Sequence, residues 1–591
     1  MLQHYTDERN IQIVISLLKA HGIKRVVASP GTTNLSFVAS IQQDSFFEIY
    51  SAVDERSAAY IACGMAAESG EAVVLSCTGA TASRNYMPAL TEAYYRNLPV
   101  LAITSAQHSG RIGALIPQVI DRFSQPNDLV KLSVHLPTIT TQEDEWNTIV
   151  KANTAILELF HHGTGPVHIN LATVYSQVYS VKELPPVRKI SRIMRGDTFP
   201  ELPDCRIGIF VGAHIPWPED LTKAVNAFCK AYDAAVFCDH TSNYEGEYRV
   251  DFSLACYQSS GWKDLLPDLL IHIGQVSGDY PSYKVGETDQ TQAVWRVSPD
   301  GKIADTFRKM TYMFEMDEYS FFQYYSAKAS GKRGSGSYAA DCRDLVSGLL
   351  ASLPDLPFSN IWIASQTASS LPTNCAVHLG ILNSLRSWNL FPFPKGIHGY
   401  SNTGGFGIDG CVSSCLGGSL IQRDKIHFLI LGDLAFFYDM NALGNRHIGR
   451  NIRILLVNNG KGTEFRNFNH PASAFERDAD CFMAAGGHYG NKSSALVRHY
   501  AEDLGFKYYC ASTKEEYLKV KDEFFQSESA AYPMLLEVFT NSQDESKALQ
   551  MALSLRNDLK KTVKDAVKAT LGKNATRILK EALQRKNGYL Q

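Results

Sequence analysis

Residues 431–465 read LGDLAFFYDMNALGNRHIGRNIRILLVNNGKGTEF, and this stretch decides the fold. An apolar strand pattern ends at Gly432-Asp433, a helical pattern follows, and a second apolar run ends at Asn458-Asn459. A strand–helix–strand unit predicts two neighbouring parallel strands, whose carboxyl ends meet at the same edge of a sheet. We therefore expect Asp433 and Asn459 to lie together at that edge, where open α/β sheets bind their ligands.

These two side chains offer the kind of oxygen that Mg²⁺ prefers. A carboxylate from Asp433, an amide oxygen from Asn459 and the backbone carbonyl of Lys461 are hard ligands, and Mg²⁺ adds water and diphosphate oxygens to such a set. The N–H groups of Leu434 and Ala435 open the next helix and would face the phosphates at its positive end. The pattern predicts a metal-bridged diphosphate site; the alternative is an aspartate that only caps a helix.

The same alternation of strands and helices recurs along the chain. Apolar runs such as AVVLSCTG, PVLAITSA and GPVHINL alternate with helical patterns in the first third, and IGIFVGA, AAVFCDH, LLIHIGQ and AVWRVSP do so in the second. The third block contains NIWIASQT, which we interpret as its first strand, and then IHFLILGD, NIRILLVNNG and YPMLLEVF. Such alternation predicts parallel sheets with helices on both faces. We expect an α/β protein with doubly wound domains at 1–180, 204–345 and 346–545, followed by a basic helical tail at 546–591.

The composition limits the classes of function. The chain has 591 residues, a net charge of −3, 45 % hydrophobic and 20 % charged residues, so no strong field attracts it to nucleic acid. Acidic residues precede the first apolar residues and no long apolar run occurs, which argues against a signal peptide and a membrane span. The twelve cysteines lack metal-ligand spacing, which favours reduced thiols. We expect a cytoplasmic protein without nucleic-acid or membrane partners.

Two further segments support a cofactor site. The first consists of two nearby stretches, SPGTT at 29–33 and DERSAAYIACGMA at 54–66. The second is SNTGGFGIDGCVSSCLGGSL at 401–420. Together with Gly-Asp-Leu and the later Asn-Asn, they resemble thiamine-diphosphate-dependent enzymes of the acetolactate synthase and menaquinone-pathway (SEPHCHC) synthase type, over nearly the whole chain. The resemblance implies thiamine diphosphate and Mg²⁺ as cofactors, and Ile408 as the residue beneath the cofactor. The cofactor-binding residues that it implies are Glu55, Gly407, Ile408, Gly432, Asp433, Leu434, Ala435 and Asn459.

Glu55 is the predicted catalytic residue. In the family that the chain resembles, the acid at the start of this helix contacts N1′ of the aminopyrimidine and favours the imino tautomer, which lets the cofactor remove its own C2 proton. We expect Glu55 to be buried among Ala58, Ala59 and Ala62, because apolar surroundings raise the pKa of a carboxyl and let it share a proton. A capping or salt-bridged glutamate is the alternative.

The substrate residues differ from the menaquinone branch. That branch carries arginines where this chain has Thr33 and Thr403, and another after the first strand of its diphosphate domain, where we place Gln366. Hydroxyl and amide groups do not replace bidentate carboxylate binders. We therefore expect that the chain is not the menaquinone enzyme itself. The substrate candidates are Thr32, Thr33, Gln366, Thr403, Arg466 and His470.

Gln118 is a second catalytic candidate, because it is similar in place to a glutamine that faces the cofactor in acetolactate synthases. A surface glutamine is the alternative for Gln118, and ordinary loop charges are the alternative for Arg466 and His470. A flavin is not expected, since the middle block lacks a glycine-rich phosphate turn.

The resemblance implies decarboxylation of a 2-oxo acid, with transfer of the acyl-anion equivalent to a carbonyl acceptor and formation of a carbon–carbon bond. The alternatives are a simple decarboxylase that releases an aldehyde, a carbon–carbon lyase or hydrolase acting on a dione without decarboxylation, and a non-catalytic family member. In this superfamily the cofactor lies between the first domain of one chain and the third domain of another. We therefore expect a homodimer or a dimer of dimers with active sites at the subunit interface.

Overall fold

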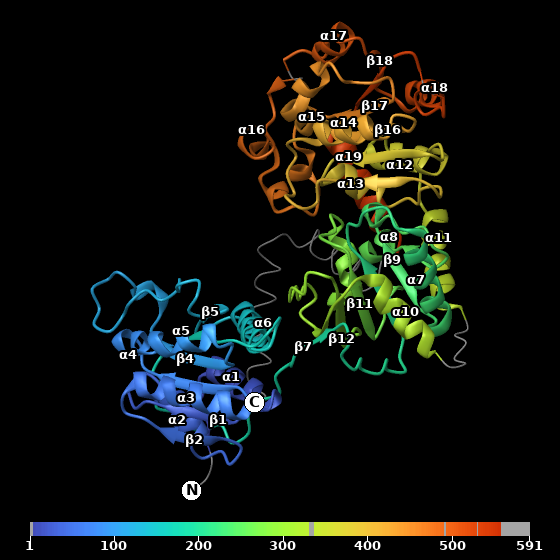
Figure 1. The fold of residues 1–591 in the computed structure, drawn as a ribbon. Helices are drawn as coiled ribbons and strands as arrows, with labels where there is room; N and C mark the ends of the chain where they lie inside the picture. The colour runs from blue at the N-terminus through green and yellow to red at the C-terminus, as the bar shows by residue number, and fades with distance from the viewer. Residues whose placement is uncertain (1–3, 330–335, 490–491, 529, 557–591) are drawn as a thin grey trace, which may run out of the picture. The chain divides into compact units, whose positions relative to one another are not determined.

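The computed structural model describes residues 4–329, 336–489, 492–528 and 530–556. Three parallel β-sheets with flanking helices form an α/β fold, as predicted (Figure 1). The chain divides into two compact units, one of Met1–Phe199 and Asp300–Glu315 and the other of Pro200–Pro299 and Met316–Gln591. The predicted tail begins within α19 (Ser542–Ala552), and its residues 557–591 lie outside the described residues. The predicted domain boundaries stay predictions.

The first unit contains a six-stranded parallel sheet with the strand order β2-β1-β3-β4-β6-β5. Its strands are β1 (Arg25–Ala28), β2 (Glu48–Ser51), β3 (Val73–Cys77), β4 (Val100–Ala106), β5 (Leu132–Leu136) and β6 (Val167–Ala172). Its helices are α1 (Arg9–Ala20), α2 (Leu35–Ile41), α3 (Glu55–Ser69), α4 (Ala80–Asn85), α5 (Met87–Tyr95) and α6 (Gln142–Glu158). The strands β7 (Ser191–Met194) and β13 (Met310–Glu315) also belong to this unit and form a parallel pair.

The apolar runs form central strands because helices cover both faces of the sheet. β3, β4 and β6 are buried at every residue, as continuous apolar runs in parallel sheets are. One core cluster joins one face to α1 through residues such as Val14 and Leu17. The other joins the opposite face to α3 through Ala58, Ala59 and Ala62. Small residues on α3 let this helix lie close against the sheet.

The second unit contains the parallel strands β10-β9-β8-β11-β12 and a six-stranded parallel sheet with the order β15-β14-β16-β17-β19-β18. The first set is β8 (Ile207–Val211), β9 (Ala235–Cys238), β10 (Arg249–Asp251), β11 (Leu269–Ile273) and β12 (Ala293–Val297). The second set is β14 (Cys375–Leu379), β15 (His398–Tyr400), β16 (Ile426–Gly432), β17 (Ile452–Asn458), β18 (Lys507–Ala511) and β19 (Met534–Phe539). The main helices are α7 (Glu219–Tyr232), α10 (Glu318–Lys328), α11 (Tyr338–Ala351), α12 (Asn360–Thr367), α13 (Asn383–Trp388), α14 (Cys411–Ile421), α15 (Asp433–Asp439), α17 (Leu496–Asp503) and α18 (Lys514–Phe524).

The segment NIWIASQT is the helix α12, so its interpretation as a strand is wrong. Ser359 caps the helix by accepting a hydrogen bond from the Trp362 N–H. Most of α12 is buried, so the sequence shows no alternation that separates a buried helix from a buried strand. The first strand of this sheet is β14, which begins at Cys375.

None of the helices in the described part of the chain is both long and apolar enough to cross a bilayer. All twelve cysteines are free thiols, in agreement with the sequence prediction, and most of them are buried.

Candidate functional site

A cavity of about 120 Å³ lies at the carboxyl ends of β16 and β17. The two strands are direct neighbours, with Gly432 opposite Val457, so the residues that follow them meet at one edge of the sheet. The cavity is much smaller than the ~300–1,000 Å³ of sites that enclose a drug-sized ligand. Predicted residues that line it are Ile408, Gly432, Asp433, Leu434, Ala435, Asn459 and Lys461.

Asp433 connects the ends of β16 and β17 through its hydrogen bonds. It is the first residue of α15 and is 4 % exposed. Its Oδ1 accepts a hydrogen bond from the Leu434 N–H at 2.8 Å, and its Oδ2 accepts one from the Gly460 N–H at 2.7 Å. Burial raises the pKa of Asp433 to about 6, against the lowering effect of these backbone donors. A buried carboxylate is a group whose charge a cation would stabilise.

The two neighbouring asparagines have different partners. Asn458 is buried, and its Nδ2 donates to Glu537 Oε1 at 2.6 Å, which ties it to β19. The Oδ1 atom of Asn459 is buried and has no hydrogen-bond partner among the described residues. An orphaned amide oxygen beside a buried carboxylate fits a divalent cation with oxygen ligands. The residues at this edge therefore fit the predicted Mg²⁺, with Asn459 rather than Asn458 as the ligand.

Sequence reasoning missed two ionisable residues that line this cavity and an arginine that pairs with one of them. Glu464 and Glu545 line it. Arg386 donates from Nη1 to both carboxylate oxygens of Glu464, at 2.8 and 3.0 Å. Burial raises the pKa of Glu545 to about 7, although the Asn360 N–H and the Thr540 hydroxyl donate to it. No motif marks these residues, which come from segments far apart in the chain.

Arg386 corrects one of the arguments about substrate residues. Because β14 is the first strand of this sheet, the segment that follows it leads into α13, which contains Arg386. A basic residue therefore does follow the first strand. Gln366 lies instead on α12, where it is exposed and donates to the Ser365 hydroxyl at 3.2 Å.

The remaining substrate candidates of this unit have structural partners. Thr403 is buried in the loop between β15 and α14. Arg466 lies 3.6 Å from the Asp480 carboxylate, and Lys461 forms an ion pair with the same residue at 2.8 Å. His470 accepts a hydrogen bond from the Ala472 N–H and so caps a 3-10 helix. None of Thr403, Arg466 and His470 lines the Asp433 cavity as the structure describes it.

Glu55 begins α3 in the other unit, and the expectation that it is buried within the chain is wrong. It is partly exposed, because it lies on the first turn, at the end of the apolar stripe formed by Ala58, Ala59 and Ala62. Its Oε2 accepts a hydrogen bond from Asn85 Nδ2 at 3.3 Å. The capping role belongs to the neighbouring Asp54, which accepts from the Arg56 N–H.

The other candidates of this unit lie in loops at the carboxyl end of the same sheet. Thr32 and Thr33 follow β1, which is the direct neighbour of β2, the strand that leads to Glu55. Thr33 Oγ1 is buried without a hydrogen-bond partner among the described residues. Gln118 is exposed in the long segment between β4 and β5, with a left-handed φ of 65°. The structure therefore places all four predicted residues after strands of one sheet.

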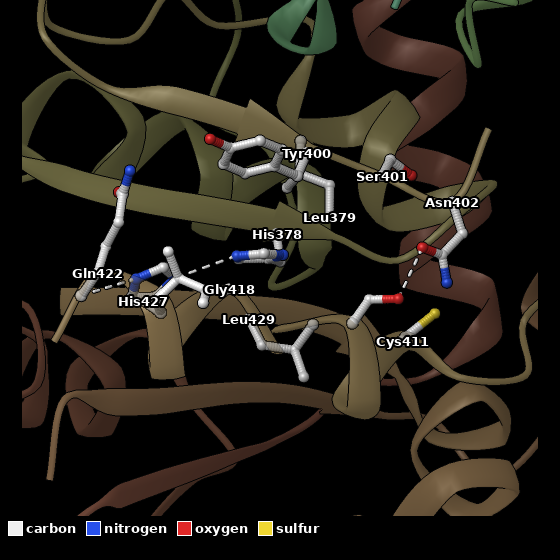
Figure 2. A pocket seen from close by; sticks show the side chains of 12 residues that line it. His378, Leu379, Tyr400, Ser401, Asn402, Cys411, Gly418, Gln422, His427 and Leu429 are labelled. Carbon is white, nitrogen blue, oxygen red and sulfur yellow. Dashed lines mark hydrogen bonds between the residues drawn. The ribbon is translucent and has the colours of Figure 1, made fainter. Parts of the chain in front are cut away.

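A larger cavity, of about 420 Å³, lies beside α14 in the second unit (Figure 2). His378 Nε2 is 3.2 Å from His427 Nδ1, and Tyr400 stacks on His378. Burial lowers the pKa of His378 to about 3 and that of His427 to about 4, so both rings are neutral at pH 7. Its lining, all within the described residues, carries no charged side chain and none of the predicted ones. It is therefore unsuited to a diphosphate, and the Asp433 cavity stays the candidate.

Comparisons with known proteins show the family to which the chain is related. Residues 10–126 match the family model "Thiamine pyrophosphate enzyme, N-terminal TPP binding domain". A relative from Phocaeicola vulgatus, named 2-succinyl-5-enolpyruvyl-6-hydroxy-3-cyclohexene-1-carboxylate synthase, is 32 % identical over 92 % of this chain and 98 % of its own. A Bacteroides fragilis relative of the same name is 31 % identical over the same shares. A solved thiamine diphosphate-dependent 4-hydroxybenzoylformate decarboxylase from Rhodococcus jostii RHA1 covers 90 % of this chain and 99 % of its own at 18 % identity, with a TM-score of 0.39, too low to support an inference.

Proposed function

The chain belongs to the thiamine-diphosphate-dependent family of 2-succinyl-5-enolpyruvyl-6-hydroxy-3-cyclohexene-1-carboxylate synthases, and on this basis we propose that it decarboxylates a 2-oxo acid and joins the remaining acyl group to a second substrate. We propose 2-oxoglutarate as the donor and isochorismate as the acceptor, by analogy with these relatives. Thiamine diphosphate and Mg²⁺ are the cofactors. The reaction forms a new carbon–carbon bond and releases CO₂.

This membership corrects the expectation that the chain is not the menaquinone enzyme. Relatives with 31–32 % identity over 92 % of the chain carry the name of that synthase. The argument against it rested on three absent arginines, and one of these positions was assigned to the wrong segment, because α12 was taken for the first strand. Arg386 follows the true first strand. Threonines at positions 33 and 403 do not exclude the assignment.

Each part of the proposed site has a defined task. Asp433 and Asn459 hold the metal with their side-chain oxygens, and the Lys461 carbonyl is the third proposed ligand. The bound cofactor supplies an electron sink for the pair released as CO₂ leaves. Glu55 holds a proton at pyrimidine N1′, and its partial exposure leaves the carboxyl accessible to a ring. The observation that carries the proposal is the pairing of the buried Asp433 carboxylate with the orphaned oxygen of Asn459.

A homodimer or a dimer of dimers is part of the proposal. The Asp433 cavity is too small for a whole thiamine diphosphate, so another surface must bind the remainder of the cofactor. α3, which carries Glu55, exposes Tyr60 at 47 % and Ile61 at 42 %, as expected of a helix that a partner subunit covers. We propose that such a partner completes the site, and that the protein works in the cytoplasm, where its free thiols stay reduced.

The test measures CO₂ and product together. The purified protein is incubated with thiamine diphosphate, Mg²⁺ and 2-oxoglutarate, with and without isochorismate, and products are identified by mass spectrometry. We expect CO₂ and the joined product in equal amounts, and neither in a Glu55→Gln variant. CO₂ with only an aldehyde would indicate a simple decarboxylase, and cleavage of a dione without CO₂ would indicate a lyase. No turnover with any 2-oxo acid in a panel would overturn the proposal.

A further inference from the structure

A second group of metal-binding side chains lies in the unit that carries Glu55. His161 and His162 follow the C-terminal end of α6, and Glu315 is the last residue of β13. Each offers one ligand atom, and these atoms lie within 4.8 Å of one another. No sequence motif marks this group, because more than 150 residues separate the histidines from the glutamate.

The two histidines lie at ion-pair distance from the two oxygens of the same carboxylate. His161 Nε2 lies 2.9 Å from Glu315 Oε2, and His162 Nε2 lies 2.7 Å from Glu315 Oε1. Oε2 is buried and has no hydrogen-bond partner among the described residues, although His161 Nε2 is so close. His161 Nε2 is instead hydrogen-bonded to the other carboxylate oxygen, Oε1, at 3.2 Å. A bound cation would give the unpartnered Oε2 atom a ligand bond.

A second layer of side chains orients the ligands. His161 Nδ1 lies 2.9 Å from Glu158 Oε2, and this contact turns Nε2 toward Glu315, as carboxylates behind metal-bound imidazoles do. Arg192 Nε lies 3.5 Å from Glu315 Oε2, and its Nη1 lies 3.7 Å from Glu158 Oε2. A carboxylate and two imidazoles are competent ligands.

The backbone at His162 has a strained conformation that places its ring beside that of His161. Its φ is +47°, a left-handed value that residues with a β-carbon rarely adopt. This conformation places the His162 ring 4.0 Å from the His161 ring, centroid to centroid. The His162 side chain is 64 % exposed, which gives an ion a path from solvent.

We propose that His161, His162 and Glu315 bind a divalent transition-metal ion, Zn²⁺ by preference, at a site separate from the Mg²⁺ site at Asp433. Two imidazoles and one carboxylate are the protein ligands of zinc sites that keep a fourth position for water. Nitrogen ligands select zinc and related ions over Mg²⁺, which prefers oxygen. A bound ion would link the segment after α6 to the end of β13.

The test uses the untagged full-length protein with saturating thiamine diphosphate and excess Mg²⁺. Zn²⁺ is titrated by calorimetry, and the metal content after dialysis is measured by mass spectrometry. We expect one Zn²⁺ per chain, and affinity at least ~10-fold weaker in His162→Ala, whose exposed side chain is dispensable for folding. The exposed His447 lies in the other unit, so His447→Ala serves as the matched control and should bind as the wild type does.

A second variant, Glu315→Gln, keeps the side-chain volume and should weaken binding by a similar factor. Circular dichroism of each variant confirms that the fold is retained. Absence of stoichiometric Zn²⁺ in the wild type would overturn the proposal. Unchanged affinity in both His162→Ala and Glu315→Gln would also overturn it, and would assign the metal to other groups such as the exposed Cys481 and Cys510.

Discussion

Replacing each of the two adjacent asparagines by alanine should have opposite effects, and this contrast tests the metal site directly. Asn459 Oδ1 is buried without a partner, so Asn459→Ala removes an unsatisfied acceptor from the free protein. We expect the free energy of unfolding of the cofactor-free protein to change by less than about 0.5 kcal/mol. Asn458 instead donates to Glu537, which is fully buried, at 2.6 Å. Asn458→Ala leaves that carboxylate short of a donor and should cost ~1–3 kcal/mol.

For the affinity of cofactor binding, we expect the larger loss in Asn459→Ala rather than in Asn458→Ala. Loss of one of the proposed protein ligands of Mg²⁺ should weaken Mg²⁺-dependent binding of thiamine diphosphate by about 100-fold, or ~2.7 kcal/mol. At a cofactor concentration of about 100 times the wild-type dissociation constant, stabilisation by the ligand is ~2.7 kcal/mol. The same concentration stabilises Asn459→Ala by only ~0.4 kcal/mol.

The assay compares denaturant unfolding of the two variants and the wild type, with and without thiamine diphosphate and Mg²⁺, and calorimetry gives the dissociation constants. The reasoning would be refuted if Asn459→Ala bound the cofactor as tightly as the wild type. It would also be refuted if the cofactor-free Asn459→Ala protein were destabilised as much as Asn458→Ala.

Three other changes have defined outcomes. Glu55→Gln should abolish turnover but keep Mg²⁺-dependent cofactor binding and the fold, since its one described hydrogen bond, from Asn85, is long at 3.3 Å; full activity in this variant would contradict the proposed role. Burial lowers the pKa of His168 from 6.5 to about 3, so the folded unit binds fewer protons than the unfolded chain, and stability should fall as the pH drops below 6.5. His168→Asn should flatten that slope by up to ~1.4 kcal/mol per pH unit in pH-dependent unfolding, and an unchanged slope would count against it. Thr141→Ala should destabilise α6 by ~1 kcal/mol, which would be measured as faster amide exchange along the helix. Thr141→Ser should keep the N-cap, because the serine hydroxyl can still accept the hydrogen bond from the Asp144 N–H.

Local patterns carried the prediction of the fold class, and the family resemblance carried that of the cofactor. The β16–α15–β17 unit is contiguous in the chain, and a parallel pair of adjacent strands brings its two ends to one edge. Asp433 and Asn459 could therefore be placed together from their positions alone. Glu55 could be placed at a helix start for the same reason. Its exposure could not be predicted, because that depends on where the sheet beneath the helix ends.

The interpretation of NIWIASQT failed because burial on all sides removes the periodicity on which such predictions rest. Because of that one error, the third sheet was predicted to start too early, and Arg386 was not recognised as a residue that follows its first strand. The prediction about the substrate was therefore made without this basic residue. A mistake in one buried segment thus changed a conclusion about function.

By itself, the sequence determined what short-range geometry determines, namely the alternation of strands and helices and the edge at which Asp433 and Asn459 meet, whereas the kind of cofactor came from the family resemblance. The tertiary structure alone decided which asparagine keeps a free oxygen, that Arg386 is held by Glu464, and that His161 and His162 meet Glu315. The physical reason is that these outcomes depend on contacts between segments distant in the chain. Packing, rather than any local pattern of residues, sets which polar atoms find partners and which remain open to a ligand.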